Sequence, residues 1–313
     1  MWQRMKWGLC VLAALSGSAM AAPLTAQYVS TIATQEEQRL HARIGIAVLD
    51  TATNSITHYR GEERFPLNST HKPLLCAALL REVDRKALAL SASTQFESSQ
   101  LVEYSPITEK HVAPDAMSWA QLCSAAVSYS DNTAANLIAR KLNGPQAVTQ
   151  FLRDSGDTIT RLDRYEPELN SAIPGDERDS TTPVAIAQTL NTLLLGNVLQ
   201  PSSREQLMQW MRDDKVADGL LRSVLPDGWK IADKTGAGDN GSRSIVSVVW
   251  PTSQKPLLVV IYITQTPATM AQRDAAIVRI GESLFSTLAV YDKKLIFDHS
   301  HPPDRKSTRL NSS

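Results

Sequence analysis

The stretch Arg43-Ile-Gly-Ile-Ala-Val-Leu-Asp50, and the segment Ser55 to Arg60 that follows it after a Thr-Asn turn, decide the class of fold. Both are rich in β-forming apolar residues, and together they predict a β-hairpin. Three more strands are predicted much later in the chain, at 230–235, 243–250 and 257–264. Strands at both ends of a chain, with helices between them, predict one antiparallel sheet of five strands.

The segment between the two groups of strands has helical periodicity. Helices are predicted at 69–86, 118–129, 132–142, 145–154, 182–195 and 202–211, and a last one at 269–288. This order predicts an α/β (α+β) fold, in which the sheet is flanked by terminal helices and interrupted by an inserted all-helical domain. The expected domains are 22–63 with 213–290 for the α/β part, and 64–212 for the all-helical part. A ligand cleft is expected between them.

The two ends of the chain are expected to lie outside this fold. A basic start precedes the apolar run Trp7 to Leu15, and Ala19-Met20-Ala21 has the form of a cleavage site, so residues 1–21 are predicted to be a secretory signal peptide. The apolar run is too short to span a bilayer, which argues against a membrane anchor in the mature protein. Residues 291–313 are polar and aperiodic and are predicted to be disordered.

Composition argues against several functions. The 313 residues contain 32 Lys and Arg against 32 Asp and Glu, and no basic block interleaves with aromatic residues, so nucleic acid is not expected as a partner. Histidines are scattered, and neither H-E-x-x-H nor paired C-x-x-C occurs, so no metal site and no cofactor are expected. The absence of G-x-S-x-G excludes the α/β-hydrolase arrangement.

Two cysteines, Cys76 and Cys123, remain once the signal peptide is removed. An even pair in an oxidising compartment favours a disulfide, and two buried free thiols are the alternative. A bridge between them would stabilise the fold by about 4 kcal/mol in the chain-entropy account.

Ser69-Thr-His-Lys72 has the form S-x-x-K. Residues three apart on a helix share one face, so the Ser69 hydroxyl and the Lys72 amine are expected to be neighbours. A serine becomes a nucleophile when a neighbour takes its proton, and a lysine can do so if its pKa is depressed. Taken alone, the motif is better explained as an N-cap followed by a surface lysine, since both residue types are common.

Ser130-Asp131-Asn132 has the form of a helix N-cap. That structural role is compatible with a chemical one, because Ser130 can relay a proton to a departing amide nitrogen and Asn132 can bind a substrate amide. Asp131 is expected to brace the turn.

Lys234-Thr235-Gly236 is expected where a strand meets the cleft. Lys234 and Thr235 can bind a substrate carboxylate, Gly236 permits close approach of the substrate backbone, and Arg243 can add a second cation. An edge strand with solvated charges is the alternative. The run 236–241 also fits G-x-G-x-x-G, but a strand follows it instead of the helix that a dinucleotide site requires.

The segment 161–179 is long and irregular, which is typical of functional loops. Arg164 and Asp179, near its ends, can pair and pin it. Glu166 and Asn170 are then spaced to hold one water between them, as the hydrolysis of an acyl-serine requires. A charged surface loop is the alternative.

The four motifs S-T-H-K, S-D-N, E-P-E-L-N and K-T-G, in this order, resemble those of the class A serine β-lactamases, over residues 24–288. The stretch 244–276 is similar to the carbenicillin-hydrolysing, penicillinase-like branch. The resemblance implies hydrolysis of the β-lactam amide of penicillins, and more weakly of early cephalosporins, through a serine acyl-enzyme that confers antibiotic resistance. It also implies a periplasmic monomer whose partner is the small-molecule β-lactam.

The resemblance also implies roles for individual residues. Lys72 and Glu166 both remain candidates for the acylation base, the amides of Ser69 and Ala237 are the implied oxyanion donors, and the Glu166–Pro167 bond is expected to be cis. The implied catalytic residues are Ser69, Lys72, Ser130, Glu166 and Asn170; the implied substrate-binding residues are Tyr104, Asn132, Lys234, Thr235, Gly236, Ala237 and Arg243; the implied structural residues are Arg164, Asp179 and the disulfide pair Cys76 and Cys123.

Two alternative functions remain open, and three residues differ from those found in related enzymes. A D,D-peptidase shares three motifs but lacks the E-x-x-x-N loop, and a β-lactam sensor domain is acylated without efficient deacylation. His71 stands where the family usually has an apolar residue. Asn68 and Gly238 exclude the disulfide found in class A carbapenemases.

Overall fold

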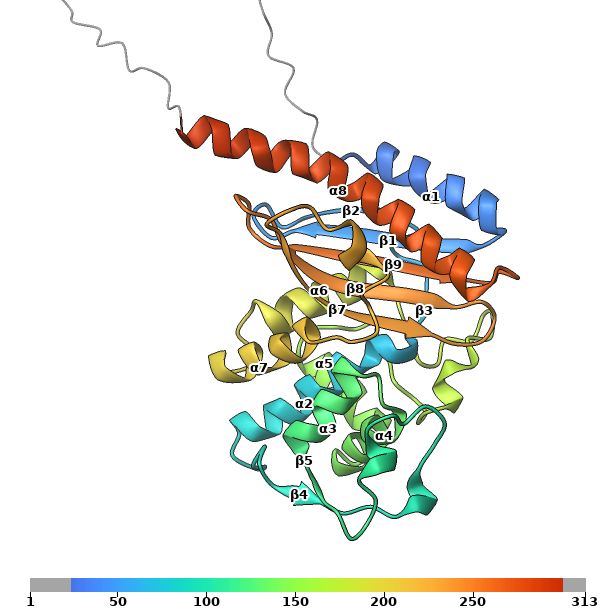
Figure 1. Cartoon of the computed structure of the whole chain (residues 1–313), viewed down its shortest axis with the longest axis vertical. Helices are drawn as coiled ribbons and strands as arrows, with labels where there is room; N and C mark the ends of the chain where they lie inside the picture. Colours follow the sequence, from blue (N-terminus) through green and yellow to red (C-terminus); the bar gives the residue numbers. More distant parts are fainter. Residues whose placement is uncertain (1–23, 301–313) are drawn as a thin grey trace, which may run out of the picture.

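Five strands form one antiparallel sheet in a computed structural model of the protein, which describes residues 24–300 (Figure 1). The predicted sheet is therefore confirmed, whereas the predicted signal peptide, 1–21, lies outside the described residues. The spatial order is β2-β1-β9-β8-β7, formed by β1 (Arg43–Asp50), β2 (Ser55–Tyr59), β7 (Lys230–Ala237), β8 (Arg243–Trp250) and β9 (Leu257–Thr264).

The first and last strands of the sheet are neighbours in space. β1 pairs along its whole length with β9, from Arg43 opposite Thr264 to Asp50 opposite Leu257. Strands from the early and the late part of the described chain are thus joined by hydrogen bonds in the middle of the sheet. β7 lies at the edge, where its carboxyl end is accessible to a ligand.

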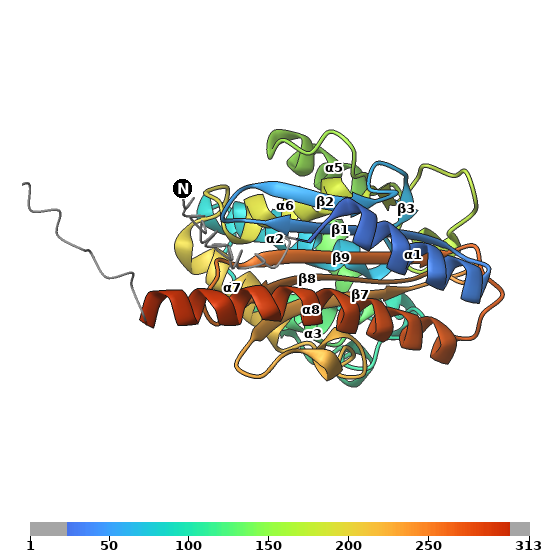
Figure 2. The same cartoon turned by 90° about the horizontal axis from the view of Figure 1, so that it is seen from above.

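The two terminal helices cover one face of the sheet, as Figures 1 and 2 show. They are α1 (Ala26–Leu40), which starts at the N-cap Thr25, and α8 (Met270–Ser300). Apolar residues of both helices, such as Val29 and Leu284, share a buried cluster with Ile46 and Val259 of the sheet. Among the described residues, no helix combines the length and the apolar composition needed to cross a bilayer.

The inserted helices lie on the other face of the sheet (Figure 1). They begin and end within three residues of the predicted bounds and are α2 (Lys72–Asp84), α3 (Trp119–Ser128), α4 (Asn132–Lys141), α5 (Pro145–Asp154), α6 (Pro183–Leu194) and α7 (Pro201–Arg212). Apolar residues of these helices, including Leu79 and Ile186, form one buried cluster with Ala47 and Val260 of the sheet. The predicted disulfide, Cys76–Cys123, joins α2 to α3.

The helix expected to start at Ser69 is divided in two. Asn68–His71 forms the 3₁₀ turn η1, and the α-helix α2 begins at Lys72. Pro73 stands in the first turn of α2, where its missing N–H breaks no hydrogen bond. Ser69 therefore belongs to a tight turn that precedes the helix and opens onto the cleft.

The C-terminal segment differs from the prediction. Disorder was expected for 291–313, but α8 continues to Ser300 and Asp292 is buried. The rest of that predicted tail, 301–313, lies outside the described residues. The Asp292 carboxylate accepts hydrogen bonds from Trp229 Nε1 at 3.1 Å, from the Thr252 amide at 3.1 Å and from the Ser253 amide at 2.8 Å. These donors hold the buried carboxylate of Asp292 in place. They therefore stabilise α8 beyond Leu288, the last residue of the helix predicted from the apolar pattern.

Substitution of Asp292 by Ala is expected to lower the free energy of unfolding by about 2 kcal/mol, because the buried Trp229 Nε1 and the part-buried amides of Thr252 and Ser253 lose a charged acceptor. Urea denaturation followed by far-ultraviolet circular dichroism measures the change. The matched control is Asp227→Ala, at an exposed carboxylate, for which a change within about 0.5 kcal/mol is expected. Equal stability of the two variants would contradict this account of Asp292.

Candidate active site

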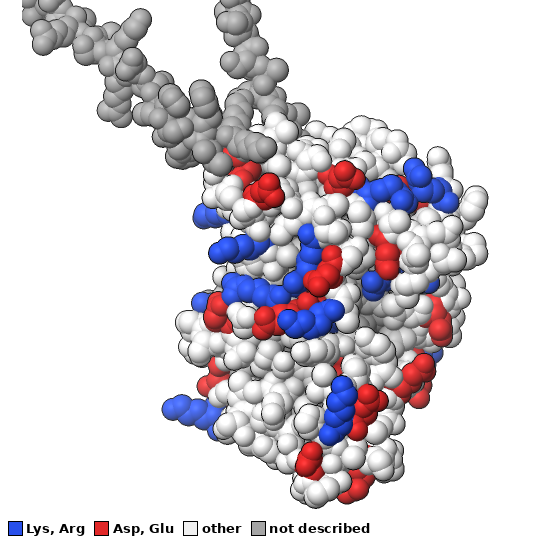
Figure 3. All heavy atoms as spheres, in the orientation of Figure 1, with Lys and Arg blue, Asp and Glu red and all other residues white. Residues whose placement is uncertain are grey.

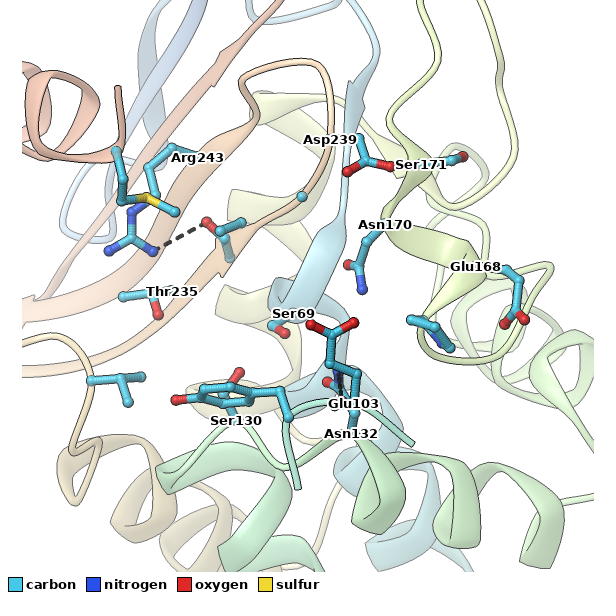
Figure 4. A pocket seen from close by; sticks show the side chains of 17 residues that line it. Ser69, Glu103, Ser130, Asn132, Glu168, Asn170, Ser171, Thr235, Asp239 and Arg243 are labelled. Atoms are coloured by element: carbon cyan, nitrogen blue, oxygen red, sulfur yellow. Dashed lines mark hydrogen bonds between the residues drawn. The ribbon is translucent and has the colours of Figure 1, made fainter. Parts of the chain in front are cut away.

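A cleft of about 680 Å³ runs between the edge strand β7 and the inserted helices. Figure 4 shows Ser69 near its centre, with Ser130 and Asn132 on one side, Asn170 on another, and Thr235 and Arg243 beyond them. Nine residues of the predicted site line the cleft: Ser69, Tyr104, Ser130, Asn132, Asn170, Thr235, Gly236, Ala237 and Arg243. Three more, Lys72, Glu166 and Lys234, are buried.

Lys72 lies directly behind the predicted nucleophile. Its Nζ is 2.9 Å from Ser69 Oγ, 2.7 Å from the Ser130 carbonyl oxygen and 2.7 Å from Asn132 Oδ1. Burial lowers the pKa of Lys72, and the Glu166 carboxylate acts in the opposite direction. A buried amine in contact with a serine hydroxyl is the arrangement that activates a serine nucleophile.

The turn that carries Ser130 is braced from both sides. Ser130 itself has φ 62°, in the left-handed region that is unfavourable for a non-glycine residue. Asp131 caps α4 by accepting a hydrogen bond from the Ala134 amide, and its other carboxylate oxygen accepts from the amides of Ile107 and Thr108 at 2.9 Å each. Ser130 Oγ consequently lies 3.4 Å from Lys72 Nζ.

The 161–179 loop is held at both ends by one buried carboxylate. Arg164 Nε is 2.6 Å from Asp179 Oδ2, and Asp179 Oδ1 accepts from the amides of Asp163 and Arg164. Asp179 is fully buried. A buried charge with this many partners orders the loop around it.

Glu166 points from this loop toward the nucleophile. Its Oε1 lies 3.3 Å from Lys72 Nζ, and its Oε2 accepts a hydrogen bond from Asn170 Nδ2 at 2.5 Å. The Glu166–Pro167 peptide bond is cis. Apart from the contact with Lys72, Glu166 Oε1 has no hydrogen-bond partner among the described residues, and the same is true of Asn170 Oδ1. Two unsatisfied acceptors thus lie in one small space beside Ser69.

The carboxyl end of β7 forms the opposite wall. Lys234 is buried, and burial is the main reason that its pKa is lowered to about 8, with Asp214 opposing the shift. Arg243 lies on β8 opposite Ala237 and pairs with Asp274 at 2.6 Å. These groups form the cationic end of the cleft.

Gly238 shows how closely β7 and the 161–179 loop approach each other. A Cβ atom at this position would lie 2.5 Å from the carbonyl oxygen of Asn170 and 2.5 Å from Asn68 Oδ1. Real side chains do not tolerate such distances, so glycine is required for this packing.

Two residues of the site were not identified from the sequence. Asn136 accepts a hydrogen bond from the Glu166 amide at 2.9 Å and donates one to the Glu166 carbonyl at 2.8 Å, which fixes the backbone of that residue. Its position four residues after Asn132 on α4 places both on one helix face, and this spacing could have revealed it. Asp214, buried near Lys234, has no comparable signal in the sequence.

Charges outside the cleft are mixed. Figure 3 shows basic and acidic side chains interspersed over one face, without a continuous basic surface. Within the part of the chain that the structure describes, no group of three or more His, Cys, Asp or Glu side chains is placed to hold a metal ion.

The comparisons with known proteins agree with this geometry. The family model described as "Beta-lactamase enzyme family" matches residues 25–288. Beta-lactamase AER-1 of Aeromonas hydrophila is 52% identical over 281 residues, which cover 90% of this chain and 92% of that protein. Together with the structural relatives described next, this match favours a β-lactamase over the peptidase and sensor alternatives.

Two solved structures illustrate the structural likeness. The class A β-lactamase of the last common ancestor of Gram-negative bacteria has a TM-score of 0.81 and 48% identity, and the match covers 83% of this chain and 99% of that one. A double mutant of the chromosome-encoded β-lactamase of Vibrio parahaemolyticus has a TM-score of 0.80 and 45% identity, with 82% and 99% covered. The chain therefore belongs to the β-lactamase enzyme family and is a class A β-lactamase, a hydrolase of β-lactams.

Proposed function

We propose that this β-lactamase hydrolyses penicillins, including carboxypenicillins, and early cephalosporins more slowly, through an acyl-enzyme on Ser69. The observation that carries the proposal is the continuous set of contacts from Ser69 Oγ to Lys72 Nζ and on to Glu166 Oε1 and Asn170, beside an open cleft. These contacts supply a proton acceptor for each of the two chemical steps: Lys72 for acylation and Glu166 for deacylation.

Substrate binding is assigned to the end of β7. Lys234, Thr235 and Arg243 bind the substrate carboxylate, and Gly236 and Ala237 lie alongside the substrate backbone. Tyr104, which is 54% exposed at the rim, flanks the acyl side chain together with Asn132. The close packing of Gly238 against the 161–179 loop limits the width of the cleft, which supports a preference for penicillins over substrates with bulky oxyimino side chains.

In the acylation step, Lys72 takes the proton of Ser69. A neutral amine at this position donates two hydrogens, to the Ser130 carbonyl and to Asn132 Oδ1, and its lone pair is left for the Ser69 hydroxyl at 2.9 Å. Burial supports the neutral form. Ser69 Oγ bonds to the lactam carbonyl carbon, the amides of Ser69 and Ala237 stabilise the oxyanion, and the carbon–nitrogen bond breaks. The proton passes through Ser130 to the leaving nitrogen.

In the deacylation step, Glu166 acts as the general base. A water between Glu166 Oε1 and Asn170 Oδ1 fits the two unsatisfied acceptors of the site. Glu166 takes one proton from this water while the water oxygen attacks the ester carbonyl carbon. The bond from that carbon to Ser69 Oγ then breaks, and the proton held by Glu166 returns through Lys72 to Ser69 Oγ. Pairing of Arg164 with Asp179 keeps the loop in place for this step.

The proposal also covers the cellular location, the oligomeric state and the domains of the protein. The signal sequence predicted at 1–21 supports export across the inner membrane to the periplasm, where β-lactams reach their targets. The protein acts there as a monomer, with the cleft between an α/β domain (22–63 and 213–290) and an all-helical domain (64–212).

Substitution of Glu166 by Ala tests the deacylation step. Turnover of benzylpenicillin is expected to fall about 10³-fold, because the general base is lost while acylation continues. Mass spectrometry of the intact protein is expected to show one penicillin bound covalently at Ser69. The control is Glu168→Ala, an exposed carboxylate two residues away at the rim, which is expected to turn over normally. Normal turnover by Glu166→Ala would refute the role of Glu166.

The pKa of Lys234 predicts a pH effect on substrate binding. Because this pKa is about 8, Lys234 is cationic below pH 8 and loses its charge above it. The KM for benzylpenicillin is therefore expected to rise as the pH increases through about 8, whereas Lys234→Arg, which stays charged, is expected to keep a constant KM up to about pH 9.5. The same pH dependence in both proteins would show that Lys234 is not the group responsible.

A substrate panel tests the proposed specificity. Values of kcat/KM are expected to be highest for benzylpenicillin and carbenicillin, lower for an early cephalosporin, and lowest for an oxyimino-cephalosporin and a carbapenem, which must enter beside Gly238. Spectrophotometric hydrolysis assays at one pH measure all five. An oxyimino-cephalosporin or carbapenem value equal to that of benzylpenicillin would contradict the proposal.

A further inference from the structure

His71 is a buried imidazole that the proposed reaction steps do not use. It ends the turn η1, two residues after the nucleophile, and its side chain is 3% exposed. Its Nδ1 lies 2.7 Å from the carbonyl oxygen of Asn68 and 4.0 Å from Glu166 Oε1. One ring nitrogen therefore faces both the nucleophile turn and the general base.

The contact with Asn68 determines the tautomer of the ring. A carbonyl oxygen can only accept a hydrogen bond, so Nδ1 must carry a hydrogen and donate it. Asn68 has φ 45°, a strained backbone conformation for a non-glycine residue, and it directly precedes Ser69. The hydrogen bond from His71, together with that from Asn68 Nδ2 to Ser242 Oγ at 2.9 Å, holds this conformation.

The same ring lies among charged groups. Burial lowers the pKa of His71, so the ring is neutral near pH 7 and gains a proton only in acid. Glu166 and Asp179 favour the cation and Lys72 opposes it. The elements packed against η1 also carry Lys234 on β7, Arg243 on β8 and Glu168 on η4 (Glu168–Ser171), which are not among the charged groups that shift this pKa.

His71 and Lys72 face the same oxygen of Glu166. Lys72 Nζ is 3.3 Å from Oε1, whereas Oε2 already accepts from Asn170. When His71 is neutral, its Nδ1 hydrogen is used by Asn68 and Lys72 alone pairs with the carboxylate. When His71 is protonated, its positive charge also stands beside Oε1.

We propose that His71 is a positioning residue: its imidazole holds the Asn68–Ser69 turn in the reactive conformation, and its protonation in acid places a positive charge beside Glu166 during deacylation. The inference rests on the role proposed above for Glu166. An apolar residue at this position provides neither the donor for Asn68 nor the titratable charge.

Two variants of matched shape separate the contribution of the hydrogen bond to Asn68 from that of the charge beside Glu166. In His71→Asn, an amide nitrogen occupies the place of Nδ1, so the hydrogen bond to Asn68 is kept and the titratable group is lost. In His71→Leu, a side chain of the same shape carries no donor. Near pH 7, kcat/KM of His71→Asn is expected within about two-fold of the wild type, and that of His71→Leu about ten-fold lower, because a buried carbonyl loses its donor.

The pH profile provides the second measurement. On the acid side, kcat of the wild type is expected to persist to lower pH than kcat of either variant, with the midpoints of the two variants higher by about half a pH unit. Equal kcat/KM for the Asn and Leu variants would overturn the role of the hydrogen bond, and an unchanged acid midpoint in His71→Asn would overturn the role of the charge. If His71→Leu fails to fold, the pH profile of His71→Asn still tests the role of the charge.

Glu166→Ala, measured in the same series, separates this inference from the one on which it depends. If that variant turns over normally, the role of Glu166 fails and the acid-limb part of the inference fails with it. If it accumulates the acyl-enzyme while the His71 variants behave as the wild type in both measurements, only the inference about His71 is wrong.

Discussion

The buried pair of Lys72 and Glu166 is the constraint on which the site depends. Both side chains are shielded from solvent, and Lys72 Nζ lies 3.3 Å from Glu166 Oε1. Buried polar groups can remain in such a place only when each is satisfied by the other and by further hydrogen bonds. Much of the surrounding structure supplies those bonds: Ser130 and Asn132 accept from Lys72, and Asn170 donates to Glu166.

Three separate parts of the chain have to meet for this pair to exist. The start of α2 brings Lys72, the start of α4 brings Asn132, and the 161–179 loop brings Glu166. Two of these parts are anchored by buried polar side chains: Asp131 braces the start of α4, Asp179 closes the loop, and Asn136 joins that loop to α4. The catalytic geometry thus follows from structural hydrogen bonds that touch no substrate.

The edge position of β7 completes the cleft. Lys234 and Thr235 lie at the end of an edge strand, so a ligand can approach them from the side that has no neighbouring strand. The loop packs against the turn after β7 at Gly238, where no side chain fits. The depth of the cleft therefore comes from the fold, and its width comes from one close backbone contact.

The sequence alone determined the five strands, the inserted helices, the disulfide pair and the residues of the four motifs, because periodicity and motif spacing are local properties. It did not show that Ser69 precedes α2 in a 3₁₀ turn, that α8 continues past Asp292, or that Asn136 and Asp214 belong to the site. Those features depend on partners far away in the chain, such as Trp229 for Asp292 and Glu166 for Asn136. Only the tertiary structure decided them, since a buried polar group takes its position from whatever satisfies its hydrogen bonds.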